Sequence, residues 1–131
     1  MGNLDERLRQ AVRNGDGAEI RRWLDAGADV DTPGEGGMTA LMYAAEHGST
    51  DKVRLLMNAG ARLDAKDATG WTALMHAAHF GHEGVVRVLT GGLADVTVRD
   101  ANGEAARDLA AKMGHARVVR LLDAVAKMRA H

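Results

Sequence analysis

Residues 37–48 read GMTALMYAAEHG, and residues 70–81 read GWTALMHAAHFG. A weaker copy, GEAARDLAAKMG, occupies residues 103–114. Successive copies are offset by 33 residues (70 minus 37, and 103 minus 70), and Gly15 lies the same distance before Gly48. Four units of one period therefore cover nearly the whole chain of 131 residues.

Each of the two middle copies marks both ends of a helix. Thr39 and Thr72 open it, because a threonine hydroxyl can accept a hydrogen bond from a free backbone N–H group of the first turn. Gly48 and Gly81 close it, where the backbone needs a left-handed residue. The paired alanines inside each copy are small enough to let neighbouring helices approach closely. The pattern predicts a short helix that is bounded at both ends.

Two apolar columns recur with the same period in the second half of each unit. One column consists of Ile20, Val53, Val86 and Val119. The other consists of Trp23, Leu56, Leu89 and Leu122. A single unit cannot bury its own apolar face, so we expect a one-dimensional array that is stabilised by contacts between neighbouring units.

This pattern resembles the ankyrin-repeat family, whose units of about 33 residues contain a turn and two helices. The matching motifs are TALMYAA at residues 39–45, TALMHAA at 72–78, and Gly-His pairs at 81–82 and 114–115. The helix exits AGADVD at residues 26–31 and AGARLD at residues 59–64 also match. The resemblance implies an all-α solenoid of stacked helix-turn-helix units with short β-hairpin loops.

The phase of the repeat divides one domain, residues 1–131, into four units. We expect an N-terminal capping repeat at residues 4–32, internal repeats at 33–65 and 66–98, and a C-terminal capping repeat at 99–131. The end units carry polar residues at signature positions, such as Arg22 and Arg107. Polar substitutions at the two ends are typical of caps that face solvent, and they favour a complete array.

Leu93 departs most sharply from the pattern, because it falls in the column of Gly27 and Gly60. A left-handed backbone is expected there, at a cost of about 1–2 kcal/mol for a residue other than glycine. We therefore predict that the second helix of this unit ends near Thr90 and that the turn moves onto residues 91–92.

Composition restricts the classes of partner. The formal net charge of −1 gives no bulk field for a nucleic acid or a membrane surface, although residues 105–131 hold six bases and two acids. No apolar run approaches the roughly 18 residues of a membrane span. The absence of cysteine fits a reducing compartment. We expect a soluble cytoplasmic protein with no nucleic-acid or membrane partner.

The chain offers little material for catalysis. It has no cysteine, Ser49 is its only serine, and no Gly-x-Ser-x-Gly elbow or phosphate-binding glycine motif occurs. His76, His79 and His82 have a spacing that could suit a metal in a hydrolase, but the resemblance implies that their side chains diverge. We therefore expect no enzyme, no catalytic residues, no metal and no cofactor.

The resemblance implies a concave groove of hairpin tips and first helices that binds another protein. Position by position, the residues expected to line it are Glu35, Met38, Glu46, His47, Thr69, Trp71, His79, Phe80, Asn102, Glu104, Lys112 and Met113. Trp71 and Phe80 are two of only four aromatic residues in the chain, and large exposed rings are enriched at interface hot spots. The hypothesis is a protein-interaction module, with Trp71 and Phe80 as anchors.

Two alternatives use the same residues differently. Trp71 could simply pack on Met38, and Phe80 on Met113, across neighbouring units. The same surface could also close a homodimer and make the chain a self-associating structural scaffold. We expect a monomer rather than a homodimer, and the partner protein's identity is not encoded in the repeat.

Overall fold

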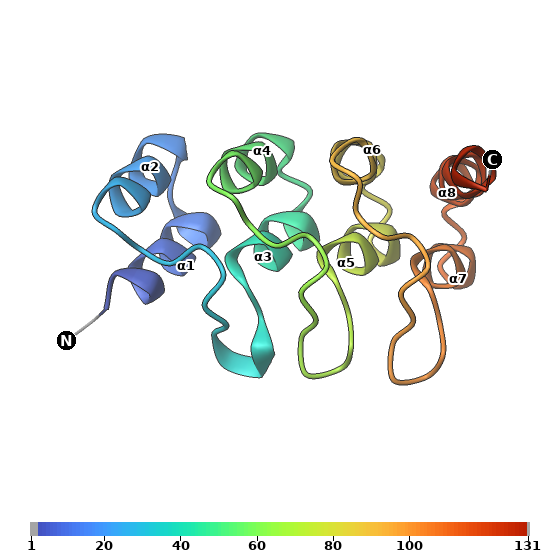
Figure 1. Ribbon diagram of the computed structural model, residues 1–131, viewed down its shortest axis with the longest axis horizontal. Coiled ribbons are helices and arrows are strands. Elements are labelled where there is room, and N and C mark those ends of the chain that lie inside the picture. The colour runs from blue at the N-terminus through green and yellow to red at the C-terminus, as the bar shows by residue number, and fades with distance from the viewer. Residues whose placement is uncertain (1–2, 131) are drawn as a thin grey trace.

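The computed structural model describes residues 3–130, and this part of the chain folds into eight α-helices (Figure 1). They are α1 (Leu4–Asn14), α2 (Gly17–Asp25), α3 (Ala40–His47), α4 (Thr50–Asn58), α5 (Ala73–His79), α6 (Glu83–Gly91), α7 (Ala106–Lys112) and α8 (Ala116–Arg129). A short 3-10 helix, η1 (Glu35–Gly37), precedes α3. The helices pack as four successive pairs, so the prediction of an all-α solenoid is confirmed.

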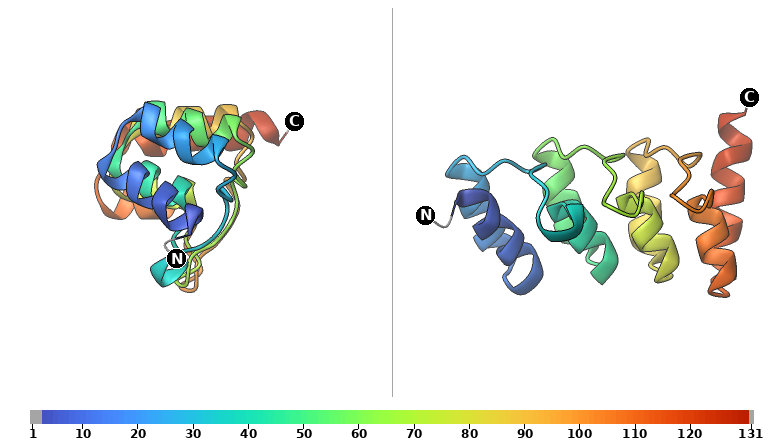
Figure 2. Two further views of the ribbon diagram at one scale, coloured as in Figure 1. Left: turned by 90° about the vertical axis from the view of Figure 1, so that its left-hand side faces the viewer. Right: turned by 90° about the horizontal axis from the view of Figure 1, so that it is seen from below.

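The pairs stack into two layers. Figure 1 shows α2, α4, α6 and α8 side by side in the upper layer and α1, α3, α5 and α7 in the lower one, with long loops hanging below. The end view on the left of Figure 2 shows the same two layers and places the loops along one side of the stack. The core lies between the layers, where Leu8, Ile20, Leu41 and Leu74 are buried.

The loops are hairpins held by backbone hydrogen bonds, and no β-strand is assigned between residues 3 and 130. In the third unit the Asp67 N–H donates to the Trp71 carbonyl at 2.9 Å. The hairpins also bond to one another, since the Ala68 N–H donates to the Gly36 carbonyl at 2.9 Å. Each loop is therefore fixed by its own turn and by its neighbour, without a regular sheet.

The first helices begin where the sequence predicted. Thr39 and Thr72 each accept a hydrogen bond at 3.3 Å, from the N–H groups of Met42 and Met75. The last unit has Ala105 in the threonine column, and there the carboxylate of Asp108 accepts from the Ala105 N–H at 2.9 Å. A different side chain therefore caps the N-terminus of α7.

The two apolar columns are fully buried in the internal units, whereas in each end unit one of the two column residues is only partly buried. Val53, Leu56, Val86 and Leu89 have no exposed surface. Val119 is only partly buried in the last unit, and so is Trp23 in the first. The Trp23 ring is covered by the guanidinium groups of Arg7 and Arg22, at 5.1 and 4.9 Å from its centre. An end unit lacks one neighbour, and long cations cover what that neighbour would bury.

The prediction for the end of α6 is wrong. The helix runs to Gly91, and Leu93 itself is left-handed with φ of 71°. The Ala94 N–H donates to the Leu89 carbonyl at 3.0 Å, and this bond repeats the one from Ala61 to Leu56. The repeat geometry therefore outweighs the local preference of leucine.

Gly92 does not take over the turn. Its φ is an ordinary −87°, and a Cβ atom there would lie 2.4 Å from Cε of Met57. This atom is the end of a flexible side chain of α4, so a small residue at position 92 would require Met57 to move.

Successive units are joined by histidine side chains that lie against glycines. Nε2–H of His82 donates to the Glu46 carbonyl at 2.8 Å, and its ring lies against Gly48, where an added Cβ would be 2.6 Å from Nδ1. His115 makes the same contact with the His79 carbonyl, beside Gly81. The Gly-His motif therefore connects two units.

Replacing Gly48 by alanine tests this contact, and Gly114 provides a matched control. Both glycines have φ of 77°, but nothing lies within 4 Å of a Cβ at Gly114. Gly114→Ala should therefore cost only the left-handed strain, about 1–2 kcal/mol. Gly48→Ala should cost about 1–3 kcal/mol more, because it displaces His82 from the partly buried Glu46 carbonyl. Urea denaturation followed by circular dichroism measures both, and equal losses would contradict the contact.

Leu93→Gly should raise the free energy of unfolding by about 0.5–1 kcal/mol. Relief of left-handed strain gives about 1–2 kcal/mol, and the greater freedom of glycine in the unfolded chain takes back part of it. Gly60→Leu makes the reverse change at φ of 89° with open space around it, and it should destabilise the fold. The same denaturation experiment compares them. A Leu93→Gly variant that is less stable than the parent would show that the leucine is not strained.

Candidate partner-binding surface

The twelve residues expected to contact a partner lie in the hairpin loops and in or beside the first helices. None of them is buried: Glu35, His47, Thr69, Phe80, Asn102, Lys112 and Met113 are exposed, and Met38, Glu46, Trp71, His79 and Glu104 are partly exposed. We call this set the loop-side surface. Its residues are accessible to a partner in the free chain, although accessibility alone does not make them a binding site.

Trp71 is held by the unit that follows it. Its indole N–H donates to Oδ2 of Asp100 at 2.9 Å, across the junction between the third and fourth units. The ring centres of His76 and His79 both lie 5.0 Å from the indole. Trp71 is therefore a partly buried bridge between two units, and only part of its surface is free for a partner.

A row of rings continues from Trp71 to the end of α5. His79 lies between Trp71 and Phe80, and it meets the Phe80 ring edge to face with centres 4.8 Å apart. Phe80 follows the last residue of α5 and is 47% exposed. The hairpin loop and the helix end of the third unit thus present one aromatic row, Trp71–His79–Phe80.

Met113 occupies in the fourth unit the position that Phe80 has in the third. Both residues follow the last residue of their helix, with φ of −92° and −91°, and Met113 is 51% exposed. Because α5 packs on α7, the equivalent positions lie on the same face of neighbouring units. Phe80 and Met113 therefore form an exposed apolar strip at the ends of two adjacent first helices.

Polar residues surround this strip. Nζ of Lys112 pairs with Oε1 of Glu104 at 3.1 Å, and the carboxylate of Glu46 lies 3.8 Å from Nδ1 of His76. Nδ1 of His47 bonds to the Tyr43 carbonyl at 2.8 Å. The loop-side surface therefore combines an apolar centre with charged neighbours of both signs.

The three histidines of the sequence pattern contact different partners. His76 is buried and donates from Nε2 to Oδ2 of Asp67 at 2.9 Å, His79 lies against Trp71, and His82 bonds to the Glu46 carbonyl. Between residues 3 and 130 no three histidine, cysteine or acidic side chains are grouped so that they could hold a metal ion.

Sequence reasoning missed Asp67 and Asp100, which organise the two hairpin loops. Oδ1 of Asp67 accepts from the N–H groups of Thr69 and Trp71, and Oδ1 of Asp100 accepts from those of Asn102 and Glu104. Their recurrence at the repeat period was a signal in the sequence. It could have identified them as the residues that shape the loops.

These hydrogen bonds lower the pKa values of both carboxyl groups. For Asp67, burial raises the pKa, but hydrogen bonds from Thr69, Trp71 and His76 outweigh it and leave the pKa below its ordinary value. For Asp100, the hydrogen bond from the Glu104 N–H is the main cause of a lowered pKa, and the Trp71 indole adds to it. The ionised forms are therefore the ones that the loops stabilise.

A family model for ankyrin repeats, in three copies, matches residues 8–100. The chain belongs to the ankyrin-repeat family. Ankyrin repeats are generally protein–protein interaction modules. A comparison with curated proteins finds no match. Among the helices described, none is long and apolar enough to cross a membrane.

The lowered pKa values predict a loss of stability in acid. A carboxyl group whose pKa is depressed by folding stabilises the fold above its unfolded pKa, and this contribution is lost as the pH falls through the folded pKa. We expect the free energy of unfolding to decline below about pH 4. Asp100→Asn removes one such group, so its unfolding free energy should change less between about pH 6 and about pH 3. Urea denaturation at each pH measures this, and identical pH dependence would contradict the role of Asp100.

Proposed function

We propose that this chain binds a partner protein through the loop-side surface, with Phe80 and Met113 at the centre of the interface. The observation that carries the proposal is the exposure of these two side chains at equivalent positions of adjacent units. Exposed apolar side chains that form a continuous surface are typical of protein interaction sites. The binding is stoichiometric, with no turnover.

Fixed neighbours support Phe80 as an anchor. The Phe80 ring contacts His79, which contacts Trp71, whose indole is bonded to Asp100 of the next unit. An anchor that is already held in place loses less conformational freedom on binding, and more of the contact energy remains as affinity. The Trp71–His79–Phe80 row is therefore a better docking surface than isolated exposed rings.

Charged residues beside the strip supply the polar rim of the interface. Glu46, His47, Glu104 and Lys112 belong to the second and fourth units, on either side of the aromatic row. Rim charges act mainly on the rate of association and on the choice of partner, whereas buried apolar anchors supply most of the affinity. The proposed partner surface therefore has an apolar centre and mixed charge around it.

Phe80→Ala and Met113→Ala test the proposal. Each should weaken binding of a partner by about 2 kcal/mol, roughly 30-fold, if the residue is a hot spot. Both side chains are about half exposed, so the variants should remain folded. Partners captured by the wild-type chain from candidate cells are identified by quantitative mass spectrometry, and the affinity of each is then measured by calorimetry with purified protein.

Arg54→Ala is the control, because the Arg54 side chain is 60% exposed but lies on α4, in the other layer and away from the loop-side surface. It should leave these affinities unchanged. Retention of every specific partner by the Phe80→Ala, Met113→Ala double variant would overturn the proposal. Light scattering of the wild-type chain separates the homodimer alternative: a dimer that Phe80→Ala converts to a monomer would assign the strip to a second copy.

A further inference from the structure

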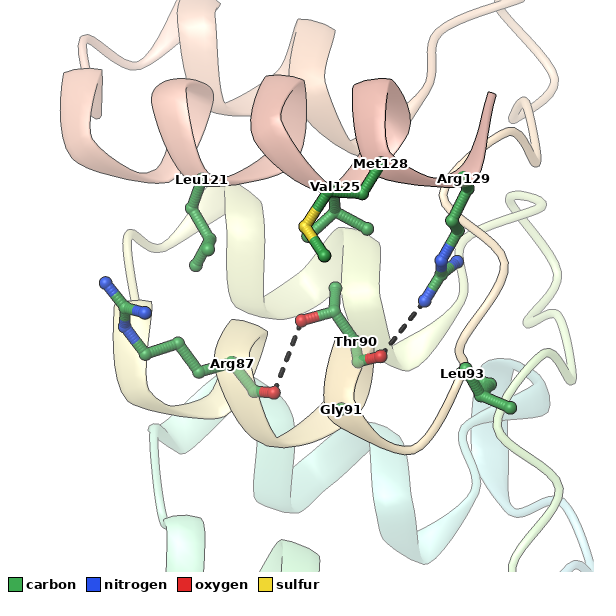
Figure 3. Close-up of a pocket in the computed structure, with 8 residues that line it drawn as sticks. All are labelled: Arg87, Thr90, Gly91, Leu93, Leu121, Val125, Met128 and Arg129. Carbon is green, nitrogen blue, oxygen red and sulfur yellow. Dashed lines mark hydrogen bonds between the residues drawn. The ribbon is translucent and has the colours of Figure 1, made fainter. Parts of the chain in front are cut away.

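A second apolar surface lies in the layer of the second helices, away from the loop-side surface. A cleft of about 410 Å³ opens between α6 and α8. Figure 3 shows Leu121, Val125 and Met128 projecting from α8 toward Arg87 and Thr90 of α6, with Leu93 at the end of the cleft. We call this site the α6–α8 cleft. It is distinct from the residues of the proposed function.

The length of α8 creates the far end of this cleft. The helix has 14 residues, whereas α2, α4 and α6 have nine each. Its final turns bring Met128 and Arg129 beside the exit of α6, where Arg129 donates to the carbonyls of Ala94 and Thr90 at 2.6 and 3.0 Å. Leu121, Val125 and Met128 are spaced i, i+4 and i+7, so they form one stripe along the helix.

Leu93 and Met128 are 78% and 76% exposed, the highest values among large apolar residues between positions 3 and 130. Leu93 also holds a left-handed backbone where the equivalent residues of earlier units are Gly27 and Gly60. Because its side chain is exposed, burial of apolar surface does little to offset that strain. Strained residues of this kind are typical of functional sites, because selection retains them for something other than stability.

Arginines lie at the two ends of the α6–α8 cleft, with Arg87 beside Leu121 and Arg129 at the opposite end (Figure 3). A neighbouring cleft shares Arg87 and Leu121 with it and continues along the same two helices. Among the described residues that line the two clefts, four are arginines (Arg87, Arg117, Arg120 and Arg129) and one is a carboxylate, Glu83. Glu83 is shared between Arg87 at 2.9 Å and Arg117 at 3.1 Å. The guanidinium groups therefore exceed the carboxylates available to pair with them.

We infer that the α6–α8 cleft binds an acidic amphipathic helix of another protein. The cleft lies between two neighbouring helices, and α6 is about 13 Å long, so a third helix of similar length can lie in it. Apolar side chains at i, i+3 or i+4, and i+7 of the partner pack on Leu93, Val125 and Met128. Its acidic side chains pair with the arginines beside Leu121, which are Arg87, Arg117 and Arg120, and this charge fixes its orientation and excludes basic helices.

Defined peptides test this inference on the full chain. One 15-residue peptide has leucines at i, i+4 and i+7 along one face of the helix and glutamates at the positions that flank this face. Its counterpart has lysine in place of every glutamate. Each is titrated into isotopically labelled protein, and the backbone amide signals are followed by NMR. The glutamate peptide should shift the amides of residues 87–94 and 120–129 and bind at least about tenfold more tightly than the lysine peptide.

Leu93→Gly is the decisive variant, because its stability and its binding should change in opposite directions. The variant should be more stable than the parent and yet bind the glutamate peptide about tenfold more weakly. Met128→Ser should weaken binding similarly, and both residues are exposed, so neither change should unfold the chain. Phe80→Ala, on the loop-side surface, is the control that should leave peptide binding unchanged.

Several results would overturn the inference. They are an absence of saturable shifts at residues 87–94 and 120–129 at millimolar peptide, equal affinity for the two peptides, and unchanged affinity in Leu93→Gly. A concentration-dependent dimer of the free chain that Leu93→Gly abolishes would assign the cleft to a second copy instead. None of these outcomes bears on the loop-side surface, so the two proposals fail independently.

Discussion

The second and third units each depend on the next unit through an imidazole ring that lies against a glycine. His82 donates to the Glu46 carbonyl, at the end of the preceding first helix, and the ring fits because Gly48 has no Cβ. The last carbonyls of a helix have no hydrogen-bond partner within it. A side chain of the following unit therefore donates to one of these free carbonyls. The same contact recurs one unit later. This contact therefore links the end of the helix, the glycine and the spacing between neighbouring units.

Where this contact is missing, another one replaces it. The second unit has Ser49 in the histidine column, and there Nζ of Lys52 donates to the Val12 carbonyl of the first helix at 2.8 Å. At the two outer faces of the described units, a cation lies over Trp23 and open space surrounds Gly114. The free energy of unfolding of such an array is approximately the sum of the stability of each unit and of the contacts between neighbouring units. Conformational constraint is accordingly greatest in the middle of the stack and least at its ends.

The sequence was sufficient to predict most of the features that recur from unit to unit. The phase of the units, the threonine helix starts and the buried columns of the internal units follow from residues 37–48 and their copies. Leu93 was mispredicted because the local preference of leucine was given more weight than the repeat geometry, in which the bond from Ala94 to Leu89 holds the left-handed turn. The bond from Trp71 to Asp100 and the α6–α8 cleft were missed for a different reason. They depend on side-chain directions and on the length of α8, and neither has a period.

The junction between the third and fourth units carries both proposed surfaces. The side-chain contacts that cross it include Trp71 to Asp100, His115 to the His79 carbonyl, and Arg129 to the carbonyls of Thr90 and Ala94. Each of them orders residues next to an exposed apolar group, on the loop side or in the α6–α8 cleft. A terminal unit of a linear array opens locally at lower free energy than the middle. These contacts oppose that opening, so the bonds that hold the last unit in place also preorganise the surfaces to which partners are proposed to bind.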